Sequence, residues 1–449
     1  MESPGSKHPR NLSRSSRPRS STRGPLAGPD DPLAAETLET DASELKTASL
    51  GELTGTSFYE LDPLAPDDLQ ETLAKDASFL LRYDIYHSLS QVDIPPALRS
   101  EFVGLIPDEP LITTLSTVER LLAEGHFLLA AYLCGSILTS SLVSPTDIKL
   151  VFGLFYTRLA CLELSGHAIL AAQESKALED LTSAFYYIDF DYHTASDNTP
   201  DQNHPKRLRH IAPWPLRVLA VRLQSIGFGD SRRGIGGLYD LGLEAWREIM
   251  RPELSRDEKI IWKERLADLG IRSVNALVEM GDYDSAKRSL NNLRTSGKAN
   301  DENRLRKALL FLVIGDLDGA VEVFGESDEN EKALFKPLLS MAEGNYKDAV
   351  VEWQELLESQ PKRPDEAMIN QNLAVCLLYT GQLNESRKLF ESLVSADHSF
   401  SSLIFNMSTV YELCSDKSGQ MKAGLVETVA RQPISGHANL DRSNADFKL

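Results

Sequence analysis

Apolar residues recur at spacings of three and four along most of the chain from about residue 58 onward. The series Leu121, Leu122, Leu129 and Leu133 is typical. This spacing places apolar side chains on one face of an amphipathic helix, and the alternation typical of strands is nearly absent. The pattern therefore predicts an all-α fold.

Interruptions of this pattern divide the chain into five regions. Residues 1–57 are rich in Ser, Pro, Arg and Gly and are predicted to form a disordered tail, because they bury too little apolar surface to offset the entropy of ordering. Residues 58–188 form a predicted N-terminal helical region with degenerate repeats. Residues 189–213 are a predicted polar loop, since Pro, Asn and Asp cluster there. Residues 214–432 are a predicted tetratricopeptide array with a C-terminal capping helix, and residues 433–449 a frayed tail.

A hexapeptide of one form occurs six times along the chain. Each copy has Gly first, a polar or small residue second, an apolar or small residue third, and Ala or Ser last. The interval from Gly281 to Gly315 is 34 residues, which matches the tetratricopeptide period of about 34. The copies are Gly125–Ala130, Gly166–Ala171, Gly281–Ala286, Gly315–Ala320, Gly344–Ala349 and Gly381–Ser386.

Each position of the hexapeptide has a physical role in a pair of helices. The Gly supplies a left-handed backbone where the first helix ends, and the small last residue allows the two helices to approach closely. The fullest copy adds Trp353 as the large apolar residue of the second helix and Pro361 as its stop. The predicted fold is therefore a tetratricopeptide-type α-solenoid, a right-handed superhelix of helix pairs. The interval from Gly166 to Gly281 has room for two or three degenerate units, and an α-solenoid of another repeat type remains the alternative.

Charge and composition exclude some classes of function. The formal net charge of −19 argues against nucleic acid as a partner, because a phosphate backbone needs a Lys/Arg surface. The longest apolar run, Phe127–Val143, contains Gly and Ser and is shorter than the roughly 18 to 20 residues that a bilayer requires. We expect a buried helix there and only peripheral membrane contact.

The predicted tail separates its charges. Arg10, Arg14, Arg17, Arg19 and Arg23 precede a run of acidic residues. Such an arm can be phosphorylated or can touch anionic lipid. A solvated tail without a site is the favoured interpretation.

No catalytic, cofactor-binding or metal-ligating residue is assigned from the sequence. The four cysteines lack Cys-x-x-Cys spacing, so we expect buried thiols that act as small apolar residues. The histidines show no metal-ligand spacing, and His204 and His210 are predicted to face solvent from the polar loop.

The segment Gly227–Gly237 (GFGDSRRGIGG) invites comparison with phosphate-binding loops. A helix, not a strand, is predicted to precede it, and no Gly-Lys-Ser/Thr follows. A helix–helix linker made flexible by Gly is the better interpretation. Arg207, Arg209, Arg232 and Arg233 form either an anion-binding patch or simply soluble loops.

Two C-terminal segments carry a family resemblance. Asn370–Leu378 (NQNLAVCLL), and Leu403–Leu413 (LIFNMSTVYEL) with Lys422 and Leu425–Ala430 behind it, resemble the family of subunit 12 of the transport (trafficking) protein particle (TRAPP) complex. The resemblance covers roughly residues 100–430. The loops at 189–213 and 227–237 depart from the family pattern.

The resemblance implies a non-catalytic tetratricopeptide scaffold or adaptor in a vesicle-tethering complex. That complex acts as a Rab guanine-nucleotide exchange assembly on early secretory (ER-to-Golgi), Golgi and autophagic membranes, and its exchange chemistry belongs to small core subunits. The implied partners are other TRAPP subunits, especially large accessory subunits, with an indirect link to a Rab GTPase. The implied location is cytoplasmic, peripherally associated with ER–Golgi intermediate or Golgi membranes.

Two other classes of function remain open on sequence alone. A chaperone cofactor needs a clamp of Lys and Asn, of which Asn370 and Asn372 are present without a regular set of basic partners. An enzyme with helical-repeat architecture is the third class. We expect the partner interface in the C-terminal array, where Phe405, Val410 and Leu413 form an apolar edge without a following repeat. Deletion from residue 400 onward is then expected to abolish partner association.

Overall fold

The computed structural model describes residues 61–66, 75–90, 110–189, 208–293, 301–324, 329–359 and 365–432. The predicted disordered tail, the predicted frayed tail, Pro361 and most of the predicted polar loop lie outside these residues. The described part is an all-α solenoid, as the apolar spacing predicts, with a single pair of very short strands. Its α-helices are α1 Leu111–Ala123, α2 Phe127–Leu138, α3 Ile148–Leu164, α4 Ala168–Glu174, α5 Trp214–Phe228, α6 Ser231–Ile249, α7 Arg256–Glu279, α8 Tyr283–Asn292, α9 Asp301–Ile314, α10 Leu317–Phe324, α11 Glu329–Ala342, α12 Tyr346–Ser359, α13 Glu366–Tyr379, α14 Leu383–Ser395, α15 Ser401–Cys414 and α16 Ser418–Arg431.

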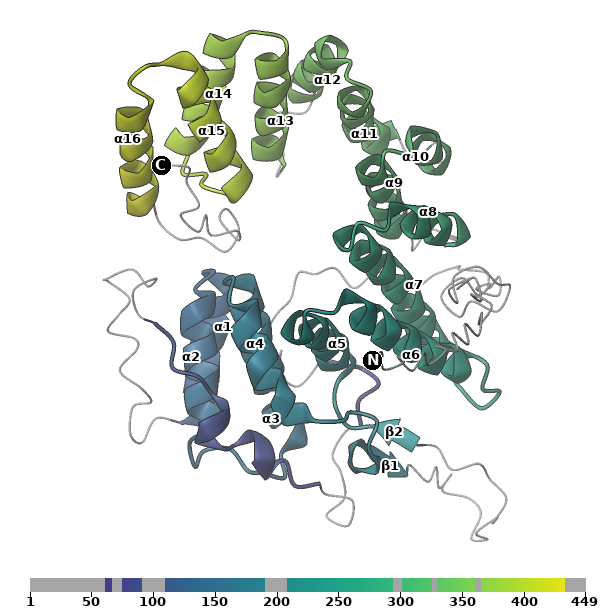
Figure 1. Ribbon diagram of the computed structural model, residues 1–449. Helices are drawn as coiled ribbons and strands as arrows, with labels where there is room; N and C mark the ends of the chain where they lie inside the picture. Colours follow the sequence, from purple (N-terminus) through teal and green to yellow (C-terminus); the bar gives the residue numbers. More distant parts are fainter. Residues whose placement is uncertain are drawn as a thin grey trace, which may run out of the picture.

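Consecutive helices stack in chain order along a curved path (Figure 1). The first five helices lie together at the bottom of the view, α7 to α12 rise along one side, and α13 to α16 curve over the top. The buried apolar residues accordingly form a series of separate clusters along the chain, each shared by neighbouring helices. Such a core is typical of solenoids, in which each unit contacts only its neighbours.

The hexapeptides form the turns between paired helices. At Gly281 the backbone is left-handed, with φ of 77°. The Gly281 N–H donates to the Val278 carbonyl at 2.9 Å, and the Asp282 N–H donates to the Leu277 carbonyl at 3.0 Å. This pair of bonds is a Schellman motif, which satisfies the last carbonyls of the first helix. The same pair of bonds and a positive φ occur at Gly125, Gly166, Gly315, Gly344 and Gly381.

The third and last positions of the hexapeptide also have regular places in the structure. Residues Tyr283, Leu317, Tyr346 and Leu383 each begin the second helix of a pair. The last residue of every copy is fully buried at the helix–helix contact, and Trp353 is fully buried in α12. These small buried residues are Ala130, Ala171, Ala286, Ala320, Ala349 and Ser386.

The interval between Gly166 and Gly281 holds fewer repeat units than expected. Within its described residues the only helix pair that it adds is α5 and α6, joined at Gly229 with φ of 61°. The rest is taken up by the 24-residue helix α7 and by irregular structure. The described residues of this interval therefore show one additional helix pair, against the two or three degenerate units expected.

The two ends of the predicted polar loop form a β-hairpin stem that the sequence did not predict. Strand β1 (Tyr187–Asp189) pairs antiparallel with β2 (Leu208–His210), with Tyr187 opposite His210. Three-residue strands are too short to show an alternating pattern. The described residues also contain short 3-10 helices, of which η7 directly precedes β1; they are η3 Ser78–Leu80, η4 Tyr83–Ile85, η6 Ser175–Leu178 and η7 Ala184–Tyr186.

The turn after α14 has the same hydrogen bonds as the hexapeptide turns but lacks their glycine. Asp397 has φ of 64°, and its N–H and that of His398 make the Schellman bonds to Val394 and Leu393. A side chain in this backbone region is strained. Asp397→Gly is therefore expected to raise the free energy of unfolding by about 0.5–1 kcal/mol, measured as a higher urea midpoint. Asp397→Ala keeps the Cβ and should bring no such gain; equal midpoints for the two variants would contradict the argument.

Candidate protein-binding surfaces

Metal ligands and reactive thiols are two kinds of chemical group that can supply catalytic chemistry. The described residues contain no group of three or more His, Cys, Asp or Glu side chains that could hold a metal ion. All four cysteines are unpaired thiols; Cys134, Cys161 and Cys376 are buried and Cys414 is partly exposed. Burial raises the pKa of Cys134 to about 12 and that of Cys376 to about 11. These two thiols stay protonated at neutral pH and are poor nucleophiles.

The Gly-rich segment is not a flexible linker, which corrects the sequence interpretation. Gly227 belongs to α5, Gly229 and Asp230 make the turn, and Gly234, Gly236 and Gly237 lie inside α6. The Asp230 side chain caps α6 by accepting from the Arg232 N–H at 3.0 Å. Added Cβ atoms at Gly234 and Gly237 would lie 2.7 Å from Ser225 Cβ and 2.8 Å from Val221 Cγ1. These glycines let α5 and α6 pack closely.

Two of the four arginines considered as an anion patch or as soluble loops have contacts within the described residues. Arg209 pairs with Glu258 at 2.8 Å, and the Arg233 guanidinium lies 4.1 Å from the centre of the Phe228 ring. Arg207 lies outside the described residues. These contacts explain the positions of Arg209 and Arg233 without a bound anion.

A buried ion pair joins α7 and the start of α5 to the segment 61–66. Asp62 pairs with Arg265, and its Oδ2 accepts from the Trp214 N–H at 2.8 Å, which caps the start of α5. The Arg265 guanidinium lies 4.9 Å from the Trp214 ring and 4.6 Å from the Trp262 ring. Asp62 thereby holds an N-terminal segment against helices that lie far along the chain. Sequence reasoning missed this residue, because nothing local to it marks such a distant contact.

His210 is partly buried and its ring makes hydrogen bonds within the protein, contrary to the prediction that it faces solvent. Its Nε2 donates to the Leu181 carbonyl at 3.0 Å, and its Nδ1 accepts from the Ala212 N–H at 3.0 Å. The ring stacks on Tyr186 with centroids 5.5 Å apart. Burial, and then the charge of Arg217, lower the pKa of His210 to about 4. His204 lies outside the described residues.

This neutral histidine is expected to make stability depend on pH. Between about pH 6.5 and 4 the unfolded chain binds a proton that the folded chain does not, so the free energy of unfolding falls as pH falls, by roughly 3 kcal/mol over the whole window. The measurement is urea unfolding of the parent and His210→Gln between pH 7 and 5. The nearby Glu244 contributes little to the pH dependence of stability in that range. Burial raises the pKa of Glu244, but the hydrogen bond and charge of Arg217 lower it by more, so the carboxylate stays ionised between pH 7 and 5. The variant should lose part of the slope; parallel curves would contradict the assignment.

The C-terminal end of the array keeps only part of its predicted apolar edge. Val410 is buried because α16 covers it, and Leu425 of α16 shares its cluster. Phe405 and Leu413 of α15 are 50% and 59% exposed, and their spacing of eight residues places them on one face of the helix. The exposed part of the edge is therefore a stripe on α15 formed by Phe405 and Leu413, called the α15 stripe below.

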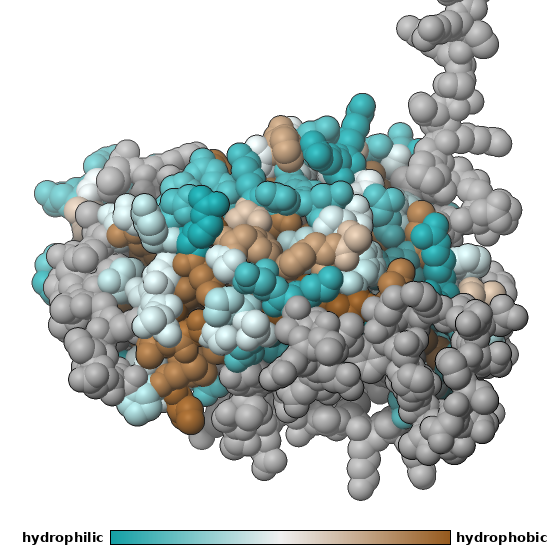
Figure 2. Space-filling model, turned by 90° about the horizontal axis from the view of Figure 1, so that it is seen from below, coloured by the Kyte–Doolittle hydropathy of each residue, from teal (hydrophilic) through white to brown (hydrophobic). Residues whose placement is uncertain are grey.

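Exposed apolar residues occur on other helices as well. Leu243, Trp246 and Met250 follow one another along an exposed face that runs from α6 to the residue after it. The face of the molecule seen from below carries a band of apolar residues bordered by hydrophilic ones (Figure 2). Apolar surface rimmed by polar residues is typical of protein–protein contacts. None of the described helices is both long enough and apolar enough to cross a membrane.

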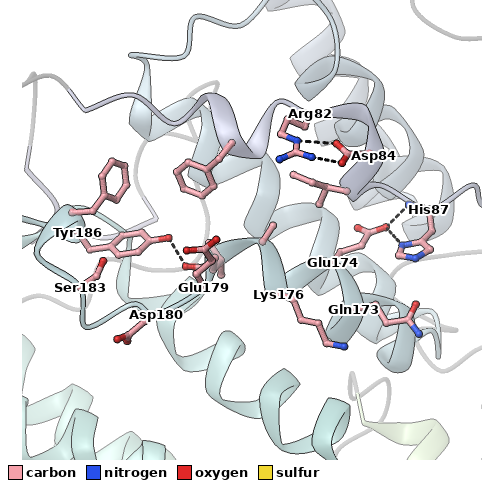
Figure 3. Close-up of a pocket in the computed structure, with 15 residues that line it drawn as sticks. Arg82, Asp84, His87, Gln173, Glu174, Lys176, Glu179, Asp180, Ser183 and Tyr186 are labelled. Atoms are coloured by element: carbon pink, nitrogen blue, oxygen red, sulfur yellow. Dashed lines mark hydrogen bonds and ion pairs between the residues drawn. The ribbon is translucent and has the colours of Figure 1, made fainter.

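A pocket of about 620 Å³ lies between the segment 79–87 and the segment 173–186. Arg82, Asp84 and His87 come from the first segment, and Glu174, Lys176 and Glu179 are among the residues of the second (Figure 3). Its volume is in the range of sites that hold a ligand or an anchoring side chain. Sequence reasoning missed this pocket, because its walls are brought together only by the fold.

These features define a helical-repeat protein with exposed surfaces suited to binding other proteins. Among known proteins, the chain is similar to trafficking protein particle complex subunit 12 of Homo sapiens, with 24% identity over 463 residues that cover 90% of this chain and 59% of the human protein. The corresponding protein of Mus musculus is 24% identical over 486 residues, which cover 96% of this chain and 58% of the mouse protein. The resemblance found in the sequence is thereby confirmed. The chain spans about three fifths of the length of these relatives, and no family model matches it.

Proposed function

We propose that this chain is a non-catalytic scaffold subunit of a TRAPP vesicle-tethering complex. The observation that carries the proposal is the similarity to trafficking protein particle complex subunit 12, which extends over nine tenths of the chain. In this proposal the repeats are of tetratricopeptide type, and the chain serves ER-to-Golgi, Golgi and autophagic membrane traffic. It acts in the cytoplasm, peripherally associated with those membranes.

The physical character of the chain supports such a role. A solenoid presents a long surface relative to its volume, so several partners can bind side by side. The net charge of −19 disfavours direct binding to nucleic acid or to anionic lipid. We propose that the partners are other TRAPP subunits, especially large accessory subunits, and that the link to a Rab GTPase is indirect.

We place the main partner interface on the C-terminal end of the array. The α15 stripe leaves two large apolar side chains in water there. Beside it, α16 is held by the buried Lys422, which pairs with Glu412, and by Gln432, whose Nε2 donates to the Val394 carbonyl at 2.7 Å. A firmly held helix end next to exposed apolar residues suits a docking surface, because little order has to be gained on binding.

Affinity purification of the tagged full-length chain from its own cells, followed by mass spectrometry, tests the proposal. Recovery of core and large accessory TRAPP subunits is expected. Recovery of a chaperone set in their place would favour the chaperone-cofactor alternative. Recovery of neither, from a chain shown by circular dichroism to be folded, would overturn the proposal.

A further inference from the structure

The pocket between the segments 79–87 and 173–186 has two walls that come from distant parts of the chain. One wall is the irregular segment with η3 and η4; the other runs from the end of α4 through η6 to η7. In Figure 3 the Arg82–Asp84 pair lies on one side of the space, and Lys176 and Glu179 lie on the other. The pocket is thus a seam between two segments and is open to solvent.

Buried hydrogen bonds hold the two walls in place. The buried Glu174 carboxylate accepts from the His87 N–H at 2.9 Å, and Arg158 donates both to Glu174 and to the His87 carbonyl, at 3.2 Å to the latter. On the far side the Tyr186 hydroxyl donates to the Leu178 carbonyl at 2.7 Å. The cavity is therefore preformed, which lowers the entropic cost of filling it.

The lining of the pocket is mixed and includes a group of apolar and aromatic side chains. Phe79, Ile85 and Phe185 are partly buried and line it together with the buried Leu178. The ammonium group of Lys75 already lies 5.6 Å from the centre of the Phe185 ring. The face of the Phe185 ring can therefore interact with a cationic side chain.

The part of the rim that runs from residue 176 to residue 180 carries a net negative charge, whereas the cation Lys75 lies at the Phe185 ring and is not counted in it. Arg82 and Asp84 pair with each other and cancel. Lys176, Glu179 and Asp180 are exposed and make no ion pair with described residues, which leaves an excess of one carboxylate. Hydrogen bonds from Thr182 lower the pKa of Asp180, so that this carboxylate is ionised at neutral pH.

We propose that this pocket binds a short basic segment of a partner protein, which places an apolar side chain among Phe79, Ile85 and Phe185 and an arginine or lysine against Glu179 and Asp180. The apolar side chains of the lining supply the anchor, and the acidic part of the rim selects the charge of the incoming segment. The pocket lies in the N-terminal half of the chain. It is thus a second binding site, separate from the α15 stripe and independent of TRAPP membership.

The test is a binding titration with two defined peptides and the purified full-length chain. Fluorescein-labelled Gly-Gly-Leu-Arg-Leu-Arg-Gly-Gly is expected to bind, and the peptide with Glu in place of Arg to bind at least about tenfold more weakly, as measured by fluorescence anisotropy. Glu179→Lys should weaken binding of the basic peptide by roughly tenfold. Glu358→Lys, an equal charge reversal on the exposed face of α12, should leave binding unchanged.

Lys176→Glu gives the deciding result, because it is expected to tighten binding of the basic peptide and no folding defect can do so. The proposal is overturned if the two peptides bind alike, if neither binds, or if Glu179→Lys and Glu358→Lys have the same effect. Since no TRAPP subunit is present in the titration, its failure leaves the proposed function untouched.

Discussion

Arg158→Met is expected to lower the free energy of unfolding by about 3–5 kcal/mol, because it leaves the Glu174 carboxylate buried without its partner. The side chains of Arg158 and Glu174 are 3% and 0% exposed. Arg158 Nε and Nη2 each donate to this carboxylate at 2.7 Å, and Nη1 donates to the Ala131 carbonyl at 2.8 Å. The Arg265–Asp62 pair is less deeply buried, with side chains that are 9% and 6% exposed, so the larger loss of stability is expected at Arg158.

Arg158→Met should loosen one segment of the chain in addition to lowering the stability of the whole protein. Since Arg158 and Glu174 both bind the backbone of His87, the segment 75–90 should lose protection from hydrogen exchange, as measured by mass spectrometry. Urea unfolding measures the loss of stability. The same two measurements on a chain with Asp62→Asn should show protection lost near Trp214 instead, because Asp62 caps α5 there.

The double variant Arg158→Met with Glu174→Met is the control. Replacing a buried ion pair by apolar groups removes the unpaired charge, so much of the lost stability should return. A double variant as unstable as the single one would show that packing of the arginine stem, and not the charge, matters. A loss below about 1 kcal/mol in the single variant would contradict the argument altogether.

Phe405→Ser combined with Leu413→Ser is expected to reduce recovery of TRAPP subunits at least about tenfold, a loss of about 1.4 kcal/mol or more in binding. Both side chains are exposed, so their replacement removes apolar contact area without opening a cavity in the core. The measurement is quantitative affinity purification of the full-length variant next to the parent.

Val321→Ser combined with Val351→Ser is the matched control. These two residues of α10 and α12 are similarly exposed and apolar, and they lie in the middle of the array. Equal losses for both double variants would show a general effect of surface polarity, and an unchanged α15 variant would place the interface elsewhere. Deletion from residue 400 onward is a weaker test, because it would also uncover the buried Phe390 and Leu393 of α14.

The repeat turns show how far local sequence can predict a solenoid. Gly at a left-handed position and a small residue five places later are requirements of the turn itself, so they are visible wherever the turn occurs. The Gly229 turn was missed as a repeat because the stretch Ser231–Gly237 is rich in glycine, which suggested a linker. Those glycines follow instead from the close packing of α6 on α5.

The charged interior shows where local sequence fails. Arg158 is a single cation in the otherwise apolar middle of α3. That contrast was the one feature of the sequence that indicated a buried charge. Gly135, noted in the sequence only as an interruption of an apolar run, is needed because an added Cβ would lie 2.5 Å from Arg158 Nη1. Neither residue reveals its partner, since the contacts span sixteen residues or more along the chain.

The sequence by itself determined the helical class, the repeated turns and the buried faces, because each depends on residues within one helix pair. Only the tertiary structure decided that the His210 ring is partly buried and hydrogen-bonded, that Val410 is covered, that Asp62 and Arg158 connect distant segments, and that a pocket forms between two segments. The physical reason is the distance along the chain between the residues that determine each feature. Helix periodicity and turn geometry are local properties, whereas burial of a charge or the closing of a pocket depends on which segments meet after folding.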